Sequence, residues 1–536
     1  MNRLRRVFDH LGPTLRSAAH LRPTQLLAFA RQRQRGPARL PIQSRAAGCD
    51  ALSIPEGFVG PSPEGTLDDE GGVRLVGQPA HDPLRLGWDP GDDPLWTYSL
   101  HYHGWLGSPA CDLDLGRATL LDWIEEHRHG VGWEPYPTSL RLLHWIGWLG
   151  RHGGALHAGQ LELVLASMSA QLGHLAAHVE VHLDGNHLWT NYAALVAGSL
   201  ALVGPVPMQL RETMAPRLLT VVREQLADDG VHRERTPSYH CLLAEQLAMV
   251  AALAQPHLPG LADPLDVASQ RMRMATPAFT HPDGDVALWG DSQLGAPVGP
   301  RRLFARANAV LGGGHATAPD SGFARRAWGP FTLLWNRGGV GLPHQVGHIH
   351  GDCLSIELSV DDTRVLVDAG VGTYREGAER EYCRSTAGHN TVTVDGHDQH
   401  ELWKSHRIGG RARLGIVEYD DDHLIGEVLG FRGTATHRRE IRRSADSIAI
   451  TDTLVPGTAG GVVRYFVPAS LRVRLIDDGA LVFLPRGPSV ELRMNGAPMR
   501  MASAPGWTAM GVAAPRTCLL AEIGASPVTL TIRTVR

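Results

Sequence analysis

Hydrophobic residues recur every three or four positions between about residues 115 and 280, as they do on the buried face of a helix. In SLRLLHWIGWLGRHG, the residues Leu140, Leu143, Ile146 and Leu149 fall on one helical face. The stretches QLELVLASMSAQLGHLAAHVEVHL and LLAEQLAMVAALAQ repeat this pattern, and glycines and prolines separate the stretches. This part of the chain is therefore predicted to consist of paired helices.

The hydrophobic period changes to two after about residue 325. Short runs such as CLSIELSV, NTVTVDG, SIAITDTL and VTLTIRTV are rich in β-branched residues and are separated by Asp, Gly and Pro turns. Their roughly even spacing is typical of an antiparallel sandwich. We expect an all-α part followed by an all-β part, with an N-terminal extension and first helices in 1–90, a helical domain in 91–325 and a β domain in 326–536.

Composition and charge exclude several other classes of protein. The 536 residues are too many for one hydrophobic core. A net charge of −4 gives no overall field that would attract nucleic acid. The longest apolar run, AALVAGSLALVG at 193–204, is shorter than the roughly 20 residues of a membrane span, so it is predicted to be a buried helix. The N-terminus shows no secretory signal pattern, which favours the cytoplasm.

The stretch GHIHGDCLSIELSV places His348, His350 and Asp352 at alternate positions before a predicted strand, so their side chains are expected to share a face. The two imidazoles could be a metal-ligand pair, one ligand and one base, or two hydrogen-bonded core histidines. Asp368 and His389 follow at predicted strand ends, and these residue types suit zinc. A simple hairpin leaves Asp368 roughly 20 Å from His350, so a shared zinc site requires a bend in the chain.

The helical half holds a second set of polar residues at predicted helix starts. DGNHLWTNY contains Asn186 and His187, and RERTPSYH contains Tyr239 and His240 just after Pro237. Each of these also has an ordinary structural interpretation. Asn186 could cap its helix, and Tyr239 could be a half-buried aromatic residue with a solvated hydroxyl.

Five motifs in this order resemble the heparinase II/III family of polysaccharide lyases, which includes related alginate lyases. The motifs are GNHLWTNYAALVAGSLAL, DGVHRERTPSYH, HPDGDVALWGDS, HIHGDCLSIELSVDDTRVLVDAGVGTY and YCRSTAGHNTVTVDGHDQHE. The likeness runs from about Trp96 to Arg413. It implies an incomplete (α/α) toroid followed by an antiparallel β-sandwich, with an acidic, uronate-containing polysaccharide bound between them and cleaved by β-elimination.

The resemblance also implies a role for each matched residue. Asn186 and His187 match the pair that neutralises the uronate carboxylate, and Tyr239 matches the catalytic acid. His348 matches the base that removes the C5 proton. Tyr374 is similar to a second active-site tyrosine of the alginate branch.

Zinc is the cofactor that the resemblance implies. His350, Asp368 and His389 match the family's ligands, which support the architecture of the cleft rather than polarise the substrate. For substrate binding, guanidinium groups suit carboxylates and aromatic rings suit sugar faces. The residues expected in that role are Arg233, Arg235, Arg384, Trp189 and His240.

Two alternatives to a lyase remain open at the level of sequence. The same scaffold could bind or handle a carbohydrate without turnover, because a fold does not fix a function. A zinc-dependent glycan hydrolase could instead use a metal-bound water. The substrate class of the family points to the periplasm or cell envelope, in contrast to the N-terminal sequence.

Overall fold

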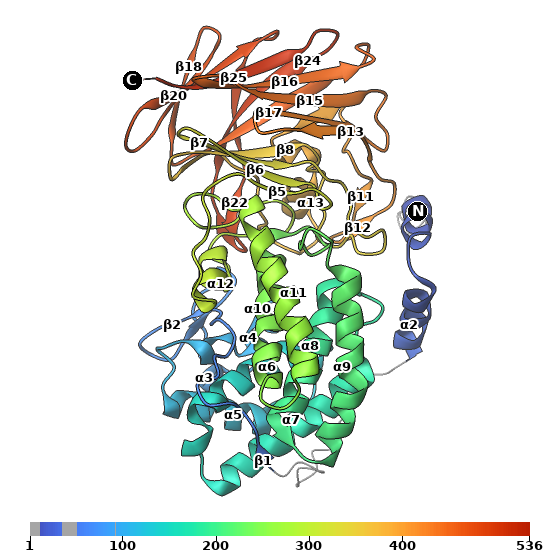
Figure 1. Cartoon of the computed structure of the whole chain (residues 1–536), viewed down its shortest axis with the longest axis vertical. Coiled ribbons are helices and arrows are strands. Elements are labelled where there is room, and N and C mark those ends of the chain that lie inside the picture. Colours follow the sequence, from blue (N-terminus) through green and yellow to red (C-terminus); the bar gives the residue numbers. More distant parts are fainter. Residues whose placement is uncertain (1–10, 35–50, 90, 92, 536) are drawn as a thin grey trace.

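The computed structural model describes residues 11–34, 51–89, 91 and 93–535. Figure 1 shows a helical part and a β-rich part stacked along the longest axis of the molecule, which confirms the predicted all-α and all-β halves. Residues 1–10 and 35–50 of the expected N-terminal extension lie outside the described residues. The main helices of the lower part are α4 (Pro94–Tyr102), α5 (Leu113–Glu126), α6 (Pro135–His152), α7 (Ala158–His178), α8 (Gly185–Ala201), α9 (Pro205–Gln225), α10 (Pro237–Ala254) and α11 (Pro259–Ala275).

Proline begins several of these helices. Pro135, Pro205, Pro237 and Pro259 are the first residues of α6, α9, α10 and α11. A helix has no internal acceptor for its first N–H groups, so proline loses nothing there, and its fixed φ already suits the helix. The shorter helices of the chain are α2 (Pro23–Gln34), α3 (Pro83–Leu86), α12 (Pro300–Arg306) and α13 (Ala378–Arg384).

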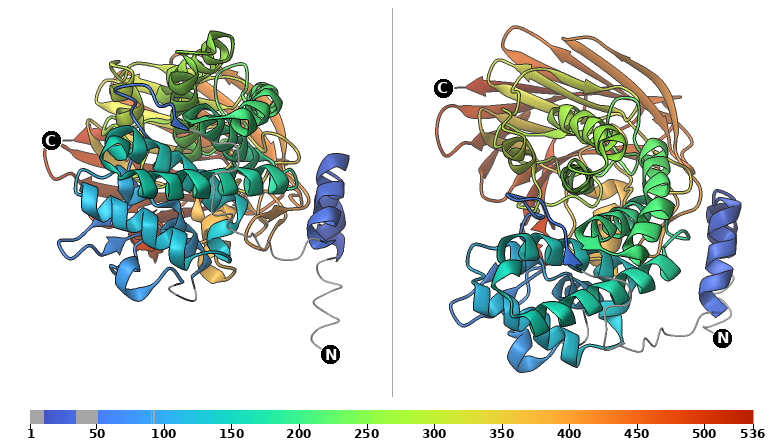
Figure 2. Two further views of the ribbon diagram at one scale, coloured as in Figure 1. Left: turned by 90° about the horizontal axis from the view of Figure 1, so that it is seen from below. Right: turned by 60° about the horizontal axis from the view of Figure 1, so that its bottom comes forward.

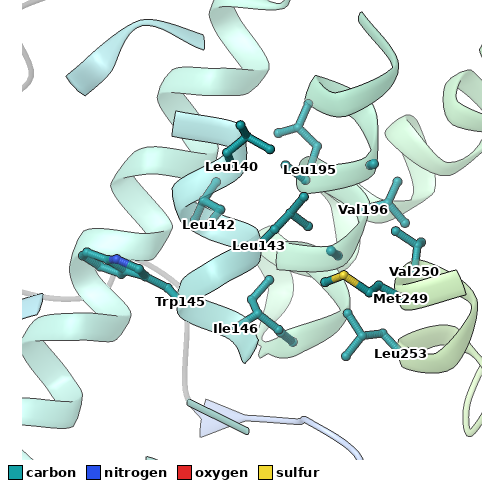
Figure 3. Packing of buried hydrophobic residues seen from close by; sticks show 14 of the residues in the cluster. Leu140, Leu142, Leu143, Trp145, Ile146, Leu195, Val196, Met249, Val250 and Leu253 are labelled. Atoms are coloured by element: carbon teal, nitrogen blue, oxygen red, sulfur yellow. The ribbon is translucent and has the colours of Figure 1, made fainter. Parts of the chain in front are cut away.

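Helices α6, α8 and α10 form the inner layer of the helical part, and Figure 3 shows their packed side chains. Leu143 and Ile146 of α6 belong to one buried cluster with Leu195 of α8 and Met249 of α10. The sequence pattern predicts one apolar face for α6, but this helix is buried on almost every side. Each fully buried leucine or isoleucine contributes about 1.5–3 kcal/mol through the hydrophobic effect.

The β-rich part contains three main antiparallel sheets. Val367 N donates to Phe466 O, which joins the edge of a five-stranded sheet to a four-stranded one, and both face an eight-stranded sheet across a shared core. The five-stranded sheet contains β5 (Ala316–Ala318), β6 (Phe323–Trp328), β7 (Phe331–Asn336), β8 (Ser355–Val360) and β9 (Thr363–Leu366). The four-stranded sheet has the order β10 (Val392–Val394), β17 (Gly461–Pro468), β24 (Arg516–Ile523) and β21 (Arg500–Ala504).

The eight-stranded sheet forms the outer layer of the sandwich. Its strands β15 and β16 alternate between buried and half-exposed residues, as expected for a sheet with one face in solvent. The order of the strands is β13 (Arg413–Tyr419), β14 (His423–Leu429), β15 (Thr436–Arg443), β16 (Ser447–Val455), β25 (Val528–Val535), β20 (Ser489–Asn495), β19 (Gly479–Phe483) and β18 (Arg472–Ile476). Pairs of two-residue or three-residue strands are β1 (Ala51–Leu52) with β4 (Leu202–Val203), β2 (Thr66–Leu67) with β3 (Val73–Arg74), β11 (Leu402–Trp403) with β12 (Arg407–Ile408), and β22 (Trp507–Ala509) with β23 (Val512–Ala513).

The five-stranded sheet is buried on both faces. Ile356 and Leu358 of β8 pack into the sandwich core, whereas Phe323 and Leu334 on the same sheet pack with Trp289 in a cluster shared with the helical part. All six residues of β8 are buried for this reason. The sheet is thus the layer on which the two halves of the molecule meet.

The N-terminal segment crosses between the two halves. Residues 11–18 are helical and α2 follows them. Figure 2 shows this pair of helices at the side of the molecule. The Arg16 Nε donates to Glu401 Oε2 of the β-rich part at 2.7 Å, and Arg22 Nη1 lies 2.6 Å from Glu224 Oε2 of α9. The segment therefore binds the β-rich part through Arg16 and helix α9 through Arg22.

Two further sequence expectations concern chemistry. The five cysteines among the described residues are all free and buried, as expected for ordinary thiols, and Cys49 lies outside those residues. No helix in the described part of the chain has the length and apolar character of a membrane span.

Candidate active site

The site lies where the starts of α8 and α10 meet loops of the β-rich part. Asp184 caps α8 by accepting a hydrogen bond from Gly185 N at 2.9 Å, so the cap is Asp184 and not Asn186. Gly185 has a φ of +55°, which favours glycine. A Cβ at this position would lie 1.9 Å from Glu234 Oε1. Gly185 therefore lets Glu234 come close to the start of the helix.

Asn186 is held by Glu234 and turned toward the β-rich part. Its side-chain Nδ2 donates to Glu234 Oε1 at 3.2 Å and to Glu234 Oε2 at 3.0 Å. The same Nδ2 lies 3.1 Å from His348 Nε2. An amide nitrogen carries two protons, so one is available for Glu234 and the other for the imidazole. The contact joins the first helical motif directly to the HxH stretch.

His348 is oriented by a buried carboxylate. Its Nδ1 lies 2.7 Å from Asp291 Oδ2. Burial alone raises the pKa of Asp291, but the Arg380 guanidinium and two imidazoles outweigh it and hold that pKa well below its usual range. An ionised carboxylate only accepts, so Nδ1 of His348 carries the proton and Nε2 presents a lone pair. The geometry is that of an oriented general base.

Tyr239 and Tyr374 lie against this imidazole. The ring centroids of Tyr239 and His348 are 4.2 Å apart, and the Tyr239 hydroxyl lies 3.0 Å from the Tyr374 hydroxyl. Burial raises the pKa of both phenols above the ordinary tyrosine value. Both hydroxyls therefore keep their protons at neutral pH, as a proton donor requires.

His187 stands beside Asn186 at the opening of the site. Its side chain is 30% exposed, and Nδ1 lies 3.2 Å from Glu180 Oε2. The ring packs at 4.4 Å against Tyr136. Burial lowers the pKa of His187, but the charge and hydrogen bond of Glu180 outweigh burial and raise this pKa above its ordinary value. The imidazole thus tends toward the cation, which suits an anionic ligand.

The sequence analysis missed four polar groups around this cluster. Asp291 and Glu234 hold His348 and Asn186, and both stand inside quoted motifs, HPDGDVALWGDS and DGVHRERTPSYH. Arg380 Nη2 donates to Asp291 Oδ2 at 2.9 Å. The ring of His406 lies 4.9 Å from that of Tyr374. The acidic residues of the motifs were a usable signal, because a base that acts at neutral pH needs a partner.

The HxH interpretation needs a correction. Residues 348–354 form turns rather than the first part of a strand, and β8 begins only at Ser355. His348 and His350 still converge, because they bind different oxygens of Asp291, at 2.7 and 2.8 Å. Asp352 accepts from Gly290 N at 3.2 Å, so its role here is to hold the loop that carries Asp291.

Four of the five predicted substrate-binding residues lie in the interior of the described structure, where each contacts other residues of the chain. Trp189 is fully buried and meets His232 edge-on. His240 is bound to Met272 O. Arg384 donates to Lys404 O and Arg407 O, and Arg235 donates to Ser321 O. These two arginines use most of their donors on backbone carbonyls, although Arg384 Nε has no partner among the described residues.

Arg233 differs from these four, because its side chain is half-buried. Its Nε is buried without a hydrogen-bond partner among the described residues. A charged donor in that state is costly unless a ligand or water satisfies it. Arg233 remains a prediction for substrate binding.

The three predicted zinc ligands lie near one another but do not form a compact cluster. His389 Nδ1 lies 2.8 Å from both oxygens of Asp368, and the rings of His350 and His389 are 5.5 Å apart. His350 Nδ1 and His389 Nε2 are buried without hydrogen-bond partners in the described residues. Two orphaned imidazole nitrogens are ligand atoms that zinc accepts, and Asp368 binds the opposite nitrogen of His389, as a carboxylate behind a zinc-bound histidine does.

A different group, Asp291, His348 and His406, has its ligand atoms within 4.8 Å of one another. Arg380 lies against both oxygens of this Asp291, through Nη1 and through Nη2. A guanidinium in that position repels a second cation. These three residues therefore suit a hydrogen-bonded network better than a metal site.

Comparison with known proteins identifies the β-rich half and the fold. Residues 312–516 match the family model described as Heparinase II/III-like, C-terminal. The whole structure is similar to a heparinase III gene product, with a TM-score of 0.61 and 16% identity over 96% of this chain and 88% of that chain. It is similar to a crystal structure of heparinase III, with a TM-score of 0.66 and 15% identity over 88% of this chain and 80% of that chain. It is also similar to heparan sulfate lyase HepC from Pedobacter heparinus, with a TM-score of 0.55 and 15% identity over 95% of this chain and 87% of that chain. The comparison with curated proteins found no match. At these identities the structural likeness establishes a shared fold, an α/α toroid followed by a β-sandwich.

Proposed function

We propose that this chain, which carries a heparinase II/III-like C-terminal domain, is a lyase that cleaves an acidic, uronate-containing polysaccharide by β-elimination. One observation carries the proposal. Asn186 and Tyr239, from two different helices, both contact His348 of a third segment. Such convergence of an amide donor, a protonated phenol and an oriented imidazole meets the requirements of proton abstraction beside a carboxylate.

The difficult step is removal of the C5 proton, because negative charge then builds on a group that is already an anion. The Asn186 Nδ2 proton that contacts His348 Nε2 would turn to the uronate carboxylate when substrate displaces this contact, and the imidazole of His187 would bind the same carboxylate. Hydrogen bonds to this carboxylate that strengthen as the charge develops lower the activation barrier for proton removal. This assigns the two neighbouring residues at the start of α8 to electrostatic stabilisation.

Elimination then moves two protons. His348 Nε2 takes the C5 proton, the C5–H electron pair forms the C4–C5 double bond, and the C4–O bond breaks. The departing oxygen receives the proton of the Tyr239 hydroxyl, and Tyr374 is within hydrogen-bond distance to stabilise the phenolate that remains. The products are a new reducing end and an unsaturated uronate, so no water is consumed.

The test is to incubate the protein with heparan sulfate, chondroitin, hyaluronan, alginate and bacterial exopolysaccharides and to follow the ultraviolet absorbance of the unsaturated uronate. We expect Tyr239→Phe and His348→Ala to lower kcat about 10²–10⁴-fold. Tyr419→Phe, at an exposed tyrosine of β13, is the matched control and should be unaffected. Binding without turnover in the wild-type protein would instead support a carbohydrate-binding role.

We also propose that His350 and His389, with Asp368, hold a structural zinc ion. When bound, zinc would cross-link the turn before β8, the end of β9 and the segment before β10. The residues themselves supply the support, since two buried nitrogens lack partners. Elemental analysis should find one zinc per chain, and His389→Ala should lose it and lower Tm. A zinc content that is unchanged in His389→Ala and His350→Ala would refute the assignment.

A further inference from the structure

A cavity of about 770 Å³ lies between α2 and the side of the toroid, apart from the catalytic cluster. Ligand sites in proteins have volumes of roughly 300–1,000 Å³. One wall is α2, which contributes Leu27, Ala28 and Arg31. The opposite wall comes from the toroid and includes Trp133, Glu134, His174, His178, Tyr192 and Arg217.

The α2 wall is held in place by contacts with the toroid and with the β-rich part. Phe29 meets His182 edge-on at 5.1 Å, and the Arg407 guanidinium lies 5.7 Å from the Phe29 ring. The preceding helical residues bind the β-rich part, where Ser17 Oγ donates to Ile408 O at 2.9 Å. Figure 2 shows how this N-terminal pair of helices flanks the body of the molecule. The cavity thus lies between α2 and the toroid, which are held together by these contacts.

The charge of the cavity favours an anion. Arg31 and Arg217 face it from opposite walls, and neither forms an ion pair with any described residue. Glu134 is the one carboxylate among the lining residues that the structure describes, and it accepts a hydrogen bond from the Tyr98 hydroxyl. Two guanidinium groups that have no ion-pair partner in the described part of the chain are suited to bind a carboxylate or sulfate.

His174, which lines the cavity, has a buried ring nitrogen without a hydrogen-bond partner among the described residues. His174 is 4% exposed, and its Nε2 lies 2.7 Å from Trp133 O. A carbonyl oxygen only accepts, so Nε2 carries the proton and Nδ1 carries a lone pair. This Nδ1 is buried and has no partner among the described residues. Its natural complement is an O–H donor, which a sugar supplies.

We propose that this cavity is a second, noncatalytic binding site for an acidic saccharide. Arg31 and Arg217 bind its carboxylate or sulfate, and His174 Nδ1 accepts from a hydroxyl. The inference rests on the substrate class of the proposed function. The loop between α7 and α8 separates the two sites, because Val179 and Val181 line the cavity while Glu180 reaches His187 at 3.2 Å. A polymer bound at both sites would be retained through the effective concentration of its second segment.

The experiment is calorimetric titration of the full-length His348→Ala protein, which keeps the saccharide intact. The probes are heparan sulfate and alginate hexasaccharides, with maltohexaose as the uncharged comparison. We expect two binding events for an acidic hexasaccharide and none for maltohexaose. Adding Arg31→Ala and Arg217→Ala should remove one event or weaken it at least tenfold. The matched control is Arg223→Ala on α9, whose guanidinium binds its own helix and does not line the cavity.

A single binding event that the Arg31→Ala and Arg217→Ala substitutions leave unchanged would overturn the proposal. It would also be overturned if these two substitutions changed the saccharide affinity no more than Arg223→Ala does. Turnover by the wild-type protein is measured separately. Two binding events without turnover would refute the lyase and keep the cavity site. Turnover with only one binding event would support the lyase and refute the cavity site.

Discussion

At the scale of single residues, the candidate site depends on carboxylates that hold other side chains in place. Asp291 binds His348 and His350 through different oxygens, and Arg380 balances its charge. Glu234 fixes Asn186 in the same way. Each functional group therefore has a buried partner that sets its orientation and, for the imidazole, its tautomer.

Asp291→Asn should lower kcat about 10²-fold or more and leave KM nearly unchanged, because a neutral amide, which also donates, no longer fixes the tautomer of the His348 imidazole as a carboxylate does. The loss of a buried charge partner for Arg380 should also cost about 3–5 kcal/mol of stability. Steady-state kinetics below the lowered Tm measures the first effect. The control is Asp283→Asn, which breaks the partly exposed ion pair with Arg364 and should spare kcat. A proportional rise in KM would indicate a binding role instead.

The pKa of His187 predicts how substrate binding depends on pH. Glu180 raises this pKa above its ordinary value against the effect of burial. The cation, which would attract the uronate of the proposed substrate, is present below this raised pKa and is lost as the pH rises through it. KM should therefore increase with pH as the His187 imidazole loses its proton.

In Glu180→Gln, burial lowers the pKa of His187 without the opposing effect of this carboxylate. The rise in KM should therefore begin at lower pH. His187→Gln should make KM larger and nearly independent of pH in this range. Initial rates between about pH 5 and 9 at constant ionic strength provide the measurement. A KM profile that is the same in all three proteins would contradict the assignment.

At the scale of secondary-structure elements, the start of α8 is the most constrained point of the site. Asp184 has a φ of +59° and Gly185 a φ of +55°, and the next residue is Asn186. Two successive residues with positive φ turn the chain sharply, so that Asn186 faces the β-rich part at the first turn of the helix. The helix start and the amide are positioned together.

Gly185→Ala should destabilise the protein by about 1–3 kcal/mol, because alanine is strained at positive φ and its Cβ would displace Glu234. Since Glu234 holds Asn186, kcat should also fall about tenfold or more. Denaturant unfolding and kinetics test both parts. Gly173→Ala is the control, because this exposed glycine of α7 has open space around it. It should be neutral or stabilise the helix by up to about 1 kcal/mol.

At the scale of the whole molecule, the two halves meet through a buried sheet and a few long-range hydrogen bonds. Arg235 extends from the loop before α10 and donates to Ser321 O at 2.6 Å and to Asn336 and Gly339 of the β-rich part. Its guanidinium also lies 4.9 Å from the Phe323 ring. The arginine predicted to bind substrate thus joins the layers instead.

Arg235→Ala should lower stability by about 3 kcal/mol or more, because three buried acceptors lose their donor. Arg235→Lys should give a smaller loss, since an ammonium cannot reproduce the planar arrangement of donors. The measurement is denaturant unfolding followed by circular dichroism and by fluorescence. Separate transitions of the two signals in Arg235→Ala would indicate that the halves unfold independently. Arg438→Ala, at a partly exposed ion pair of β15, is expected to cost no more than about 1 kcal/mol.

Sequence by itself determined the order of the halves and most of the residues that meet in the site. The period of hydrophobic residues is local, so it distinguishes the helices around Leu143 from the strands around Ile450. The motifs supplied Asn186, Tyr239 and His348 as residue types suited to one reaction. Which of the flanking residues face a ligand could not be obtained this way, because burial depends on what packs on top of a segment.

Only the tertiary structure decided the partners. Asp291 lies 57 positions from His348, and Glu234 lies 48 positions from Asn186. No local pattern brings them together. The turn at 348–354 also replaces the expected strand, because His348 and His350 bind Asp291 and Asp352 binds the adjacent backbone. Electrostatic partners are chosen by distance in space, whereas periodicity reports only which elements form. That is why the sequence indicated the chemistry and the fold fixed its geometry.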